Sequence, residues 1–96
     1  MQKQWYLISY DVHSEARLRR VARKLEGYGS RIQYSIFRCR LNPRELERLR
    51  WELLRLMELE DDLMCIRLCG NCASNIWQKG QRHDWTTEDK GYEIIG

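Results

Sequence analysis

One feature constrains the fold more than any other: the first apolar segment, residues 4–11 (QWYLISYD), is largely apolar on both faces. Alternate side chains of a strand point to opposite faces, so Trp5 and Leu7 lie on one face and Tyr6 and Ile8 on the other. A strand with one solvated face would alternate apolar and polar residues instead. The segment is therefore predicted to be a central strand of a sheet that is covered on both sides.

A helix and a hairpin are predicted next. Ser14 is suited to cap a helix, and Gly27 and Gly29 stop it. The helix has an apolar stripe at helical spacing, made of Leu18, Val21, Ala22 and Leu25. Residues 31–41 are strand-like but long for one strand, so a tight hairpin is expected near Tyr34–Ser35.

A second helix is predicted to begin at Asn42, with Pro43 at its first position and Glu45 completing a capping box. Its inner face is expected to carry Leu46, Leu49, Leu53, Leu56 and Met57. The acidic residues 58–62 end it, and residues 63–68 follow as a buried strand. Residues 76–77 could form one more short strand.

This order of elements predicts an α+β domain of the ferredoxin-like βαββαβ type, with residues 1–96 as a single domain. Two helices cover one face of such a sheet, so the apolar second face needs another cover, most simply a second copy of the chain. Residues 84–96 form a polar tail that ends in an apolar stub, 92–95. We expect this stub to add an edge strand to the partner's sheet in a symmetric homodimer.

Charge is distributed unevenly along the chain. Residues 1–50 hold 12 Lys/Arg against 5 Asp/Glu and residues 51–96 hold 5 against 9, giving net charges of +7 and −4 that together make the overall +3. A basic half indicates an anionic partner, and nucleic acid is the commonest for so small a protein. No apolar run is long enough to span a membrane and no signal peptide is recognisable, so a cytoplasmic protein with reduced thiols is expected.

Asp11 is the candidate catalytic and metal-binding residue, because it closes the first strand, where a carboxylate can point into a cleft. One carboxylate per chain is poorly suited to acid–base catalysis, which needs two groups with separated pKa values. Two copies of Asp11, facing each other across a dimer axis, could instead hold a hard cation such as Mg²⁺, which activates water and offsets phosphodiester charge. The alternative is that Asp11 caps the turn into the following helix.

Basic side chains lie outside the apolar stripe of the first helix. Arg17, Arg20 and Lys24 recur at i, i+3 and i+7 and therefore share one face. They could follow a phosphate backbone together with Arg31, Arg38 and Arg40. The alternative is a solvated helix face with a few Glu partners.

The cysteine motif CGNC, residues 69–72, has Cys65 and His83 as further candidate ligands. Structural zinc sites usually have two such pairs, and a redox CxxC opens a helix after a strand. A turn with buried thiols is therefore favoured over either role. Walker, GxGxxG, GxSxG and HExxH motifs are absent from the sequence, which argues against NTP hydrolysis and serine chemistry.

Several segments are recognisable together: WYLISYDV, then RLRRVARKLEGYGSRIQYSIFRCRL, then a Leu-rich helix and a strand that ends in CGNC. With them the chain resembles the CRISPR-associated Cas-two family, the small protein of the spacer-acquisition machinery. The most specific part is EGYG-x-R-I-Q-x-S-I-F, residues 26–37, downstream of a strand that closes in Tyr-Asp.

The resemblance implies a ferredoxin-like protomer in a symmetric homodimer, with the Asp11 of each chain placed around Mg²⁺ across the dimer axis. Tyr10 precedes the aspartate as in the family. The basic and aromatic positions that the family carries near the cleft correspond to Arg17, Arg20, Arg31 and Phe37. His13 and Ser14 stand where many members have a second acid or a hydroxyl group.

The resemblance also implies two activities. Members are described as metal-dependent endonucleases acting on single-stranded RNA or duplex DNA. They are also described as non-catalytic scaffolds that bridge dimers of the Cas-one integrase and hold a DNA duplex. A toxin-like ribonuclease on the same fold is a further alternative.

Overall fold

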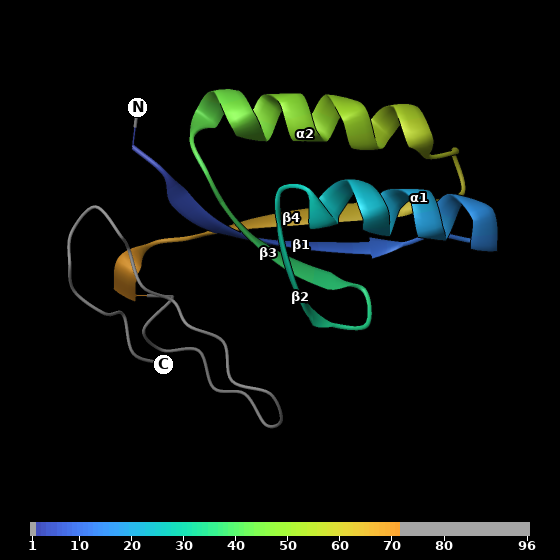
Figure 1. The fold of residues 1–96 in the computed structure, drawn as a ribbon, viewed down its shortest axis with the longest axis horizontal. Helices are drawn as coiled ribbons and strands as arrows, with labels where there is room; N and C mark the ends of the chain where they lie inside the picture. Colours follow the sequence, from blue (N-terminus) through green and yellow to red (C-terminus); the bar gives the residue numbers. More distant parts are fainter. Residues whose placement is uncertain (1, 72–96) are drawn as a thin grey trace.

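The predicted alternation of strands and helices is confirmed in a computed structural model, which describes residues 2–71 (Figure 1). The elements are β1 (Gln4–Asp11), α1 (Glu15–Glu26), β2 (Gly29–Gln33), β3 (Ile36–Leu41), α2 (Pro43–Leu56) and β4 (Asp62–Leu68). The strands form one antiparallel sheet in the order β2-β3-β1-β4, which is the ferredoxin-like topology. As predicted, β1 is central, with β3 on one side and β4 on the other.

Both helices lie on one face of the sheet, and the core fills the space between these two layers (Figure 1). The inward side chains of β1 are Tyr6, Ile8 and Tyr10, all buried. The other fully buried side chains come from both helices and from β3, namely Val21, Leu25, Phe37, Cys39, Leu49 and Leu53. Burying each large apolar side chain contributes about 1.5–3 kcal/mol, so this cluster is the main source of stability.

The predicted helix starts are confirmed by their capping bonds. The side chain of Ser14 accepts a hydrogen bond from the Arg17 backbone N–H at 3.4 Å. At α2 the capping box is complete: Asn42 Oδ1 accepts from the Glu45 N–H at 2.8 Å, and Glu45 Oε1 accepts from the Asn42 N–H at 2.9 Å. These bonds satisfy backbone donors that the first helical turn would otherwise leave unpaired.

The predicted hairpin turns at Tyr34–Ser35, between β2 and β3. Gly29, which begins β2, is needed for close approach: a Cβ there would collide with the Arg38 carbonyl oxygen and with Cys39 on β3. Gly27 is different, because it ends α1 with right-handed helical angles (φ −76°) and a Cβ there would lie 3.4 Å from its nearest neighbour.

One prediction about the last strand is wrong. Residues 63–68 do form the greater part of β4, but β4 is an edge strand, and Met64 and Ile66 are 56% and 44% exposed. The apolar run reflects the open face of the sheet, which the chain's own helices do not cover. The thiols of Cys65 and Cys69, expected to be buried, are exposed as well, because Cys65 lies on this edge strand and Cys69 follows its end.

The remaining expectations for the C-terminal part concern Cys72, His83 and residues 76–77 and 84–96, including the stub at 92–95, and they lie outside the described residues. No helix between residues 2 and 71 is long and apolar enough to cross a membrane.

Replacing Gly29 by alanine tests the packing of β2 against β3. We expect Gly29→Ala to lower the free energy of unfolding by about 1–3 kcal/mol, because the added methyl group forces the two strands apart. Gly27→Ala is the matched control and should change stability by less than about 1 kcal/mol. Urea unfolding followed by circular dichroism measures both, and equal values for the two variants would contradict this account of Gly29.

Candidate metal and nucleic-acid site

Asp11 lies on the open face of the sheet, at the end of β1. Strand register places it directly opposite Asp62, the first residue of β4. Since Tyr10 points into the core, its neighbour Asp11 points to the other face, and Asp62 shares that face across the β1–β4 pair. The side chain of Asp11 is 72% exposed, so solvent and ligands can reach it.

His13 completes a cluster with these two carboxylates. One ligand atom from each of Asp11, His13 and Asp62 lies within 4.8 Å of the others, and His13 Nε2 is 3.7 Å from Asp11 Oδ2. Like charges directly opposite each other destabilise a strand pair, and a cation relieves that repulsion. The donor set therefore fits a divalent cation, with the two carboxylates as the oxygen ligands that Mg²⁺ prefers.

Asp61, the residue before this cluster's second carboxylate, ties three segments together. Its oxygens accept from the Arg17 guanidinium at 2.9 and 3.1 Å. They also accept from the backbone N–H of His13 at 3.0 Å and from that of Glu58 at 2.9 Å. We call this set of bonds the Asp61 clamp, and it fixes the β1–α1 connection against the α2–β4 connection.

The clamp also sets the ionisation of its members. The Arg17 guanidinium and the two backbone donors hold the pKa of Asp61 well below its usual range. The hydrogen bond to Asp61 likewise raises the pKa of Arg17. The Arg17 side chain is only 20% exposed. Arg17 was predicted to bind nucleic acid, but in the structure it holds the two loops together.

Tyr10, Phe37 and Arg31 form a separate group on the helix side of the sheet. Phe37 is fully buried, and its ring centroid lies 6.2 Å from that of Tyr10. The Arg31 guanidinium carbon lies 5.2 Å from the centroid of the Phe37 ring. Burial raises the pKa of Tyr10. Phe37 thus supports its neighbours from inside the core, where it has no access to a nucleic-acid base.

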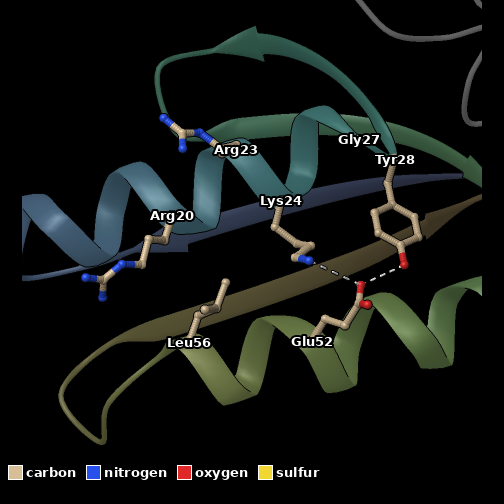
Figure 2. A pocket seen from close by; sticks show the side chains of 7 residues that line it. All are labelled: Arg20, Arg23, Lys24, Gly27, Tyr28, Glu52 and Leu56. Carbon is tan, nitrogen blue, oxygen red and sulfur yellow. Dashed lines mark hydrogen bonds and ion pairs between the residues drawn. The ribbon is translucent and has the colours of Figure 1, made fainter.

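Arg20 lies apart from both the Asp61 clamp and the Phe37 group. It lines a pocket of about 540 Å³ between the two helices. Figure 2 shows Lys24 turned toward Glu52, while the guanidinium groups of Arg20 and Arg23 extend away from that carboxylate. Glu52 accepts a hydrogen bond from the Tyr28 hydroxyl at 2.7 Å and pairs with Lys24 at 4.0 Å. Glu52 and Lys24 therefore neutralise each other, while Arg20 and Arg23 have no carboxylate partner among residues 2–71.

The residues predicted for one site are thus divided among the open sheet face, the loop clamp, the core and the helix layer. Sequence reasoning missed Asp62 as the partner of Asp11, because their pairing depends on strand register across 50 residues. It also missed the roles of Asp61 and His13. An acidic pair at the start of a strand, and a histidine two residues after Asp11, were the available signals.

Comparison with known proteins shows which family this chain matches. The model of the family described as CRISPR associated protein Cas2 matches residues 4–76. The CRISPR-associated endoribonuclease Cas2 1 of Chloroflexus aurantiacus is 42% identical over 74 residues, which cover 75% of this chain and 80% of that protein. The CRISPR-associated endoribonuclease Cas2 of Chlorobaculum tepidum is 35% identical over 92 residues, covering 91% and 92%.

Solved structures share the fold. The crystal structure of Streptococcus pyogenes Cas2 at pH 6.5 has a TM-score of 0.72 and 29% identity, and the match covers 79% of this chain and 99% of that one. A hypothetical protein of Thermus thermophilus, TT1823, has a TM-score of 0.68 and 37% identity, covering 70% and 83%.

The Asp61 clamp predicts a specific pH dependence of stability. A carboxylate whose pKa is lowered by folding contributes stability that is present above its unfolded pKa and is lost as pH falls toward its folded pKa. We expect Asp61→Asn to lower the melting temperature at pH 7 by roughly 5 °C or more. The difference from the wild type should shrink as the pH is lowered below about 4.

Thermal unfolding from pH 7 down to pH 2 measures this difference. The matched control is Glu60→Gln, since Glu60 contacts Arg17 only at 3.8 Å. It should change the melting temperature little at any pH. A wild-type–Asp61→Asn difference that stays constant over this range would contradict the assigned ionisation of Asp61.

Proposed function

The chain belongs to the CRISPR-associated Cas2 family, and from that premise we propose that it is a metal-dependent endonuclease of spacer acquisition. We further propose that it cleaves single-stranded RNA, duplex DNA or both, with the cytoplasm as its setting. The relatives from Chloroflexus aurantiacus and Chlorobaculum tepidum carry the name endoribonuclease. Cys39 and Cys65 are free thiols, in agreement with a reducing compartment.

One observation carries this proposal: Asp11 stands opposite Asp62 at an open strand end, with His13 beside it. Two carboxylates in this position repel each other unless a cation or a proton lies between them. Their exposure leaves room for a phosphodiester to approach. A carboxylate with a purely structural role is instead surrounded by donors, as Asp61 is in the loop between α2 and β4.

In this proposal Asp11 and Asp62 hold Mg²⁺. When bound, the cation supplies an activated water and offsets the negative charge that develops on the phosphodiester. His13 is a candidate to move a proton at its Nε2 atom, because an imidazole can both donate and accept near neutral pH. Arg17 and Asp61 position these groups through the backbone of His13 and do not contact the substrate.

The proposed active form is a symmetric homodimer formed through the open sheet face. Leu7, Met64 and Ile66 lie together on that face by strand register, and the last two are half exposed. An apolar sheet face of this kind needs a cover, and a second copy supplies one with the same pattern. Asp11 is on the same face, so in this proposal the Asp11 of each chain faces the dimer axis, where the two carboxylates would share the cation.

A scaffold without cleavage is the alternative, with the Cas-one integrase as partner and a DNA duplex as ligand. It is favoured by one observation: Arg20 and Arg23 are exposed on the helix layer, on the opposite side of the sheet from Asp11. A basic surface in that position can hold nucleic acid whether or not Asp11 binds a metal. Both functions use the same dimer.

Removing the Asp11 carboxylate tests the cleavage proposal. We expect Asp11→Asn, or EDTA added to the wild type, to lower the cleavage rate on the order of 10³-fold or more, since metal-assisted activation of water is lost. Glu15→Gln, an exposed acid four residues away, should cleave like the wild type. The assay compares single-stranded RNA and duplex DNA with Mg²⁺ and with EDTA.

Cleavage that co-purifies with the protein and survives undiminished in Asp11→Asn would contradict the proposed site. Wild-type protein that binds duplex DNA and the Cas-one protein, but cleaves nothing with Mg²⁺, would favour the scaffold.

The dimer has its own test. Light scattering should give a mass near twice 11.7 kDa for the wild type. Ile66→Lys should give a monomer at micromolar concentration, because a charge is buried at the centre of the face. Leu59→Lys is the control, since Leu59 lies fully exposed before β4 and away from the sheet face. A wild-type monomer, or a dimeric Ile66→Lys variant, would contradict this interface.

A further inference from the structure

The outer face of α2 carries arginines around one exposed tryptophan, and the Asp11 site does not use them. Arg44, Arg48, Trp51 and Arg55 recur at i, i+4, i+7 and i+11, so they share one face of the helix. All four are exposed, whereas the opposite face of α2 packs into the core through Leu49 and Leu53. We call this set the α2 stripe.

The charge of the stripe is uncompensated. Among residues 2–71, no carboxylate lies within ion-pair distance of Arg44 or Arg48. Arg50, on the flank of the same helix, differs in this respect because it pairs with Glu47 at 3.6 Å. The neighbouring acids Glu47 and Glu52 pair with Arg50 and Lys24 instead. Guanidinium groups that no carboxylate pairs favour an anionic ligand, and their planar shape suits phosphate oxygens.

Trp51 gives the stripe a second chemical property. The Arg55 guanidinium carbon lies 4.6 Å from the centroid of the Trp51 ring, in a cation–π contact that restrains the ring. Trp51 nevertheless remains 59% exposed. A restrained, flat and exposed indole offers a stacking surface, which every nucleic-acid base can use irrespective of its identity.

We propose that the α2 stripe binds a single nucleic-acid strand, with an unpaired base stacked on Trp51 and neighbouring phosphates on its arginines. A duplex fits less well, because its bases are already stacked on each other. A protein partner also fits less well, because the stripe presents three arginines beside Trp51, and the exposed Leu54 on its flank adds only one further apolar side chain. The stripe spans about 16 Å of helix, which is room for a few nucleotides.

This proposal rests on the proposed function for the class of its ligand. It is therefore tested by binding in an Asp11→Asn background, so that cleavage plays no part in the result. Fluorescence anisotropy of a labelled oligouridylate gives the Kd at several salt concentrations. A DNA duplex of the same length is measured alongside. The full-length protein is used, and circular dichroism checks the fold of each variant.

The variants separate stacking from charge. Trp51→Ala should weaken binding of the single strand roughly 5- to 150-fold, and Trp51→Phe should restore most of it. Arg48→Gln should reduce the slope of log Kd against log salt by about 0.7, the value for one phosphate contact on a single strand. Arg50→Gln, the matched control, should leave both the Kd and the slope unchanged.

Three results would overturn the proposal. The first is binding of the single strand that Trp51→Ala and Arg48→Gln leave unchanged, and the second is an equal effect of Arg48→Gln and Arg50→Gln. The third is an effect of Trp51→Ala confined to the duplex or to self-association.

The same experiments distinguish this proposal from the endonuclease proposal. If the wild type cleaves no nucleic acid but Trp51-dependent binding persists, the endonuclease proposal fails while the α2 stripe stands. Asp11-dependent cleavage without Trp51-dependent binding gives the reverse conclusion.

Discussion

The pairing of β1 with both of its neighbours is the constraint on which the rest of the structure depends. Its register sends Tyr6, Ile8 and Tyr10 into the core and places Asp11 opposite Asp62 on the open face. Because side chains alternate, a slip of one residue would bury the carboxylate and expose the tyrosine. The buried face therefore fixes the geometry of the candidate site on the opposite side of the sheet.

Local rules explain which parts of this structure could be predicted from the sequence. The caps at Ser14 and Asn42 and the turn at Tyr34–Ser35 depend on residues within a few positions of each other, and they were found. The opposition of Asp11 and Asp62 depends on the register of strands far apart in the chain, and it was not. The exposure of β4 was also missed, because an apolar run looks the same whether helices or a second molecule cover it.

The Asp61 clamp changes how the basic residues of the chain should be interpreted. Arg17, Arg20 and Lys24 share one helix face in the sequence pattern, but the structure gives them different tasks. Arg17 holds loops together, and Lys24 neutralises Glu52. Only Arg20 of the three extends without a carboxylate partner among the described residues. Spacing identifies residues on one face, whereas their ion pairs show which charges are left for a ligand.

The sheet separates the α2 stripe from the Asp11–Asp62 pair. A nucleic-acid strand bound to the α2 stripe therefore cannot reach Asp11 through the core. The connection from α2 to β4 offers the short way around. Arg55 lies in the last turn of α2, and the chain then reaches Asp62 within seven residues. In Figure 1 the C-terminal end of α2, the start of β4 and the end of β1 lie at the same end of the molecule. A nucleic-acid strand that leaves the α2 stripe past Arg55 would therefore arrive at the Asp11–Asp62 pair. The α2 stripe would in this way retain the substrate near the site.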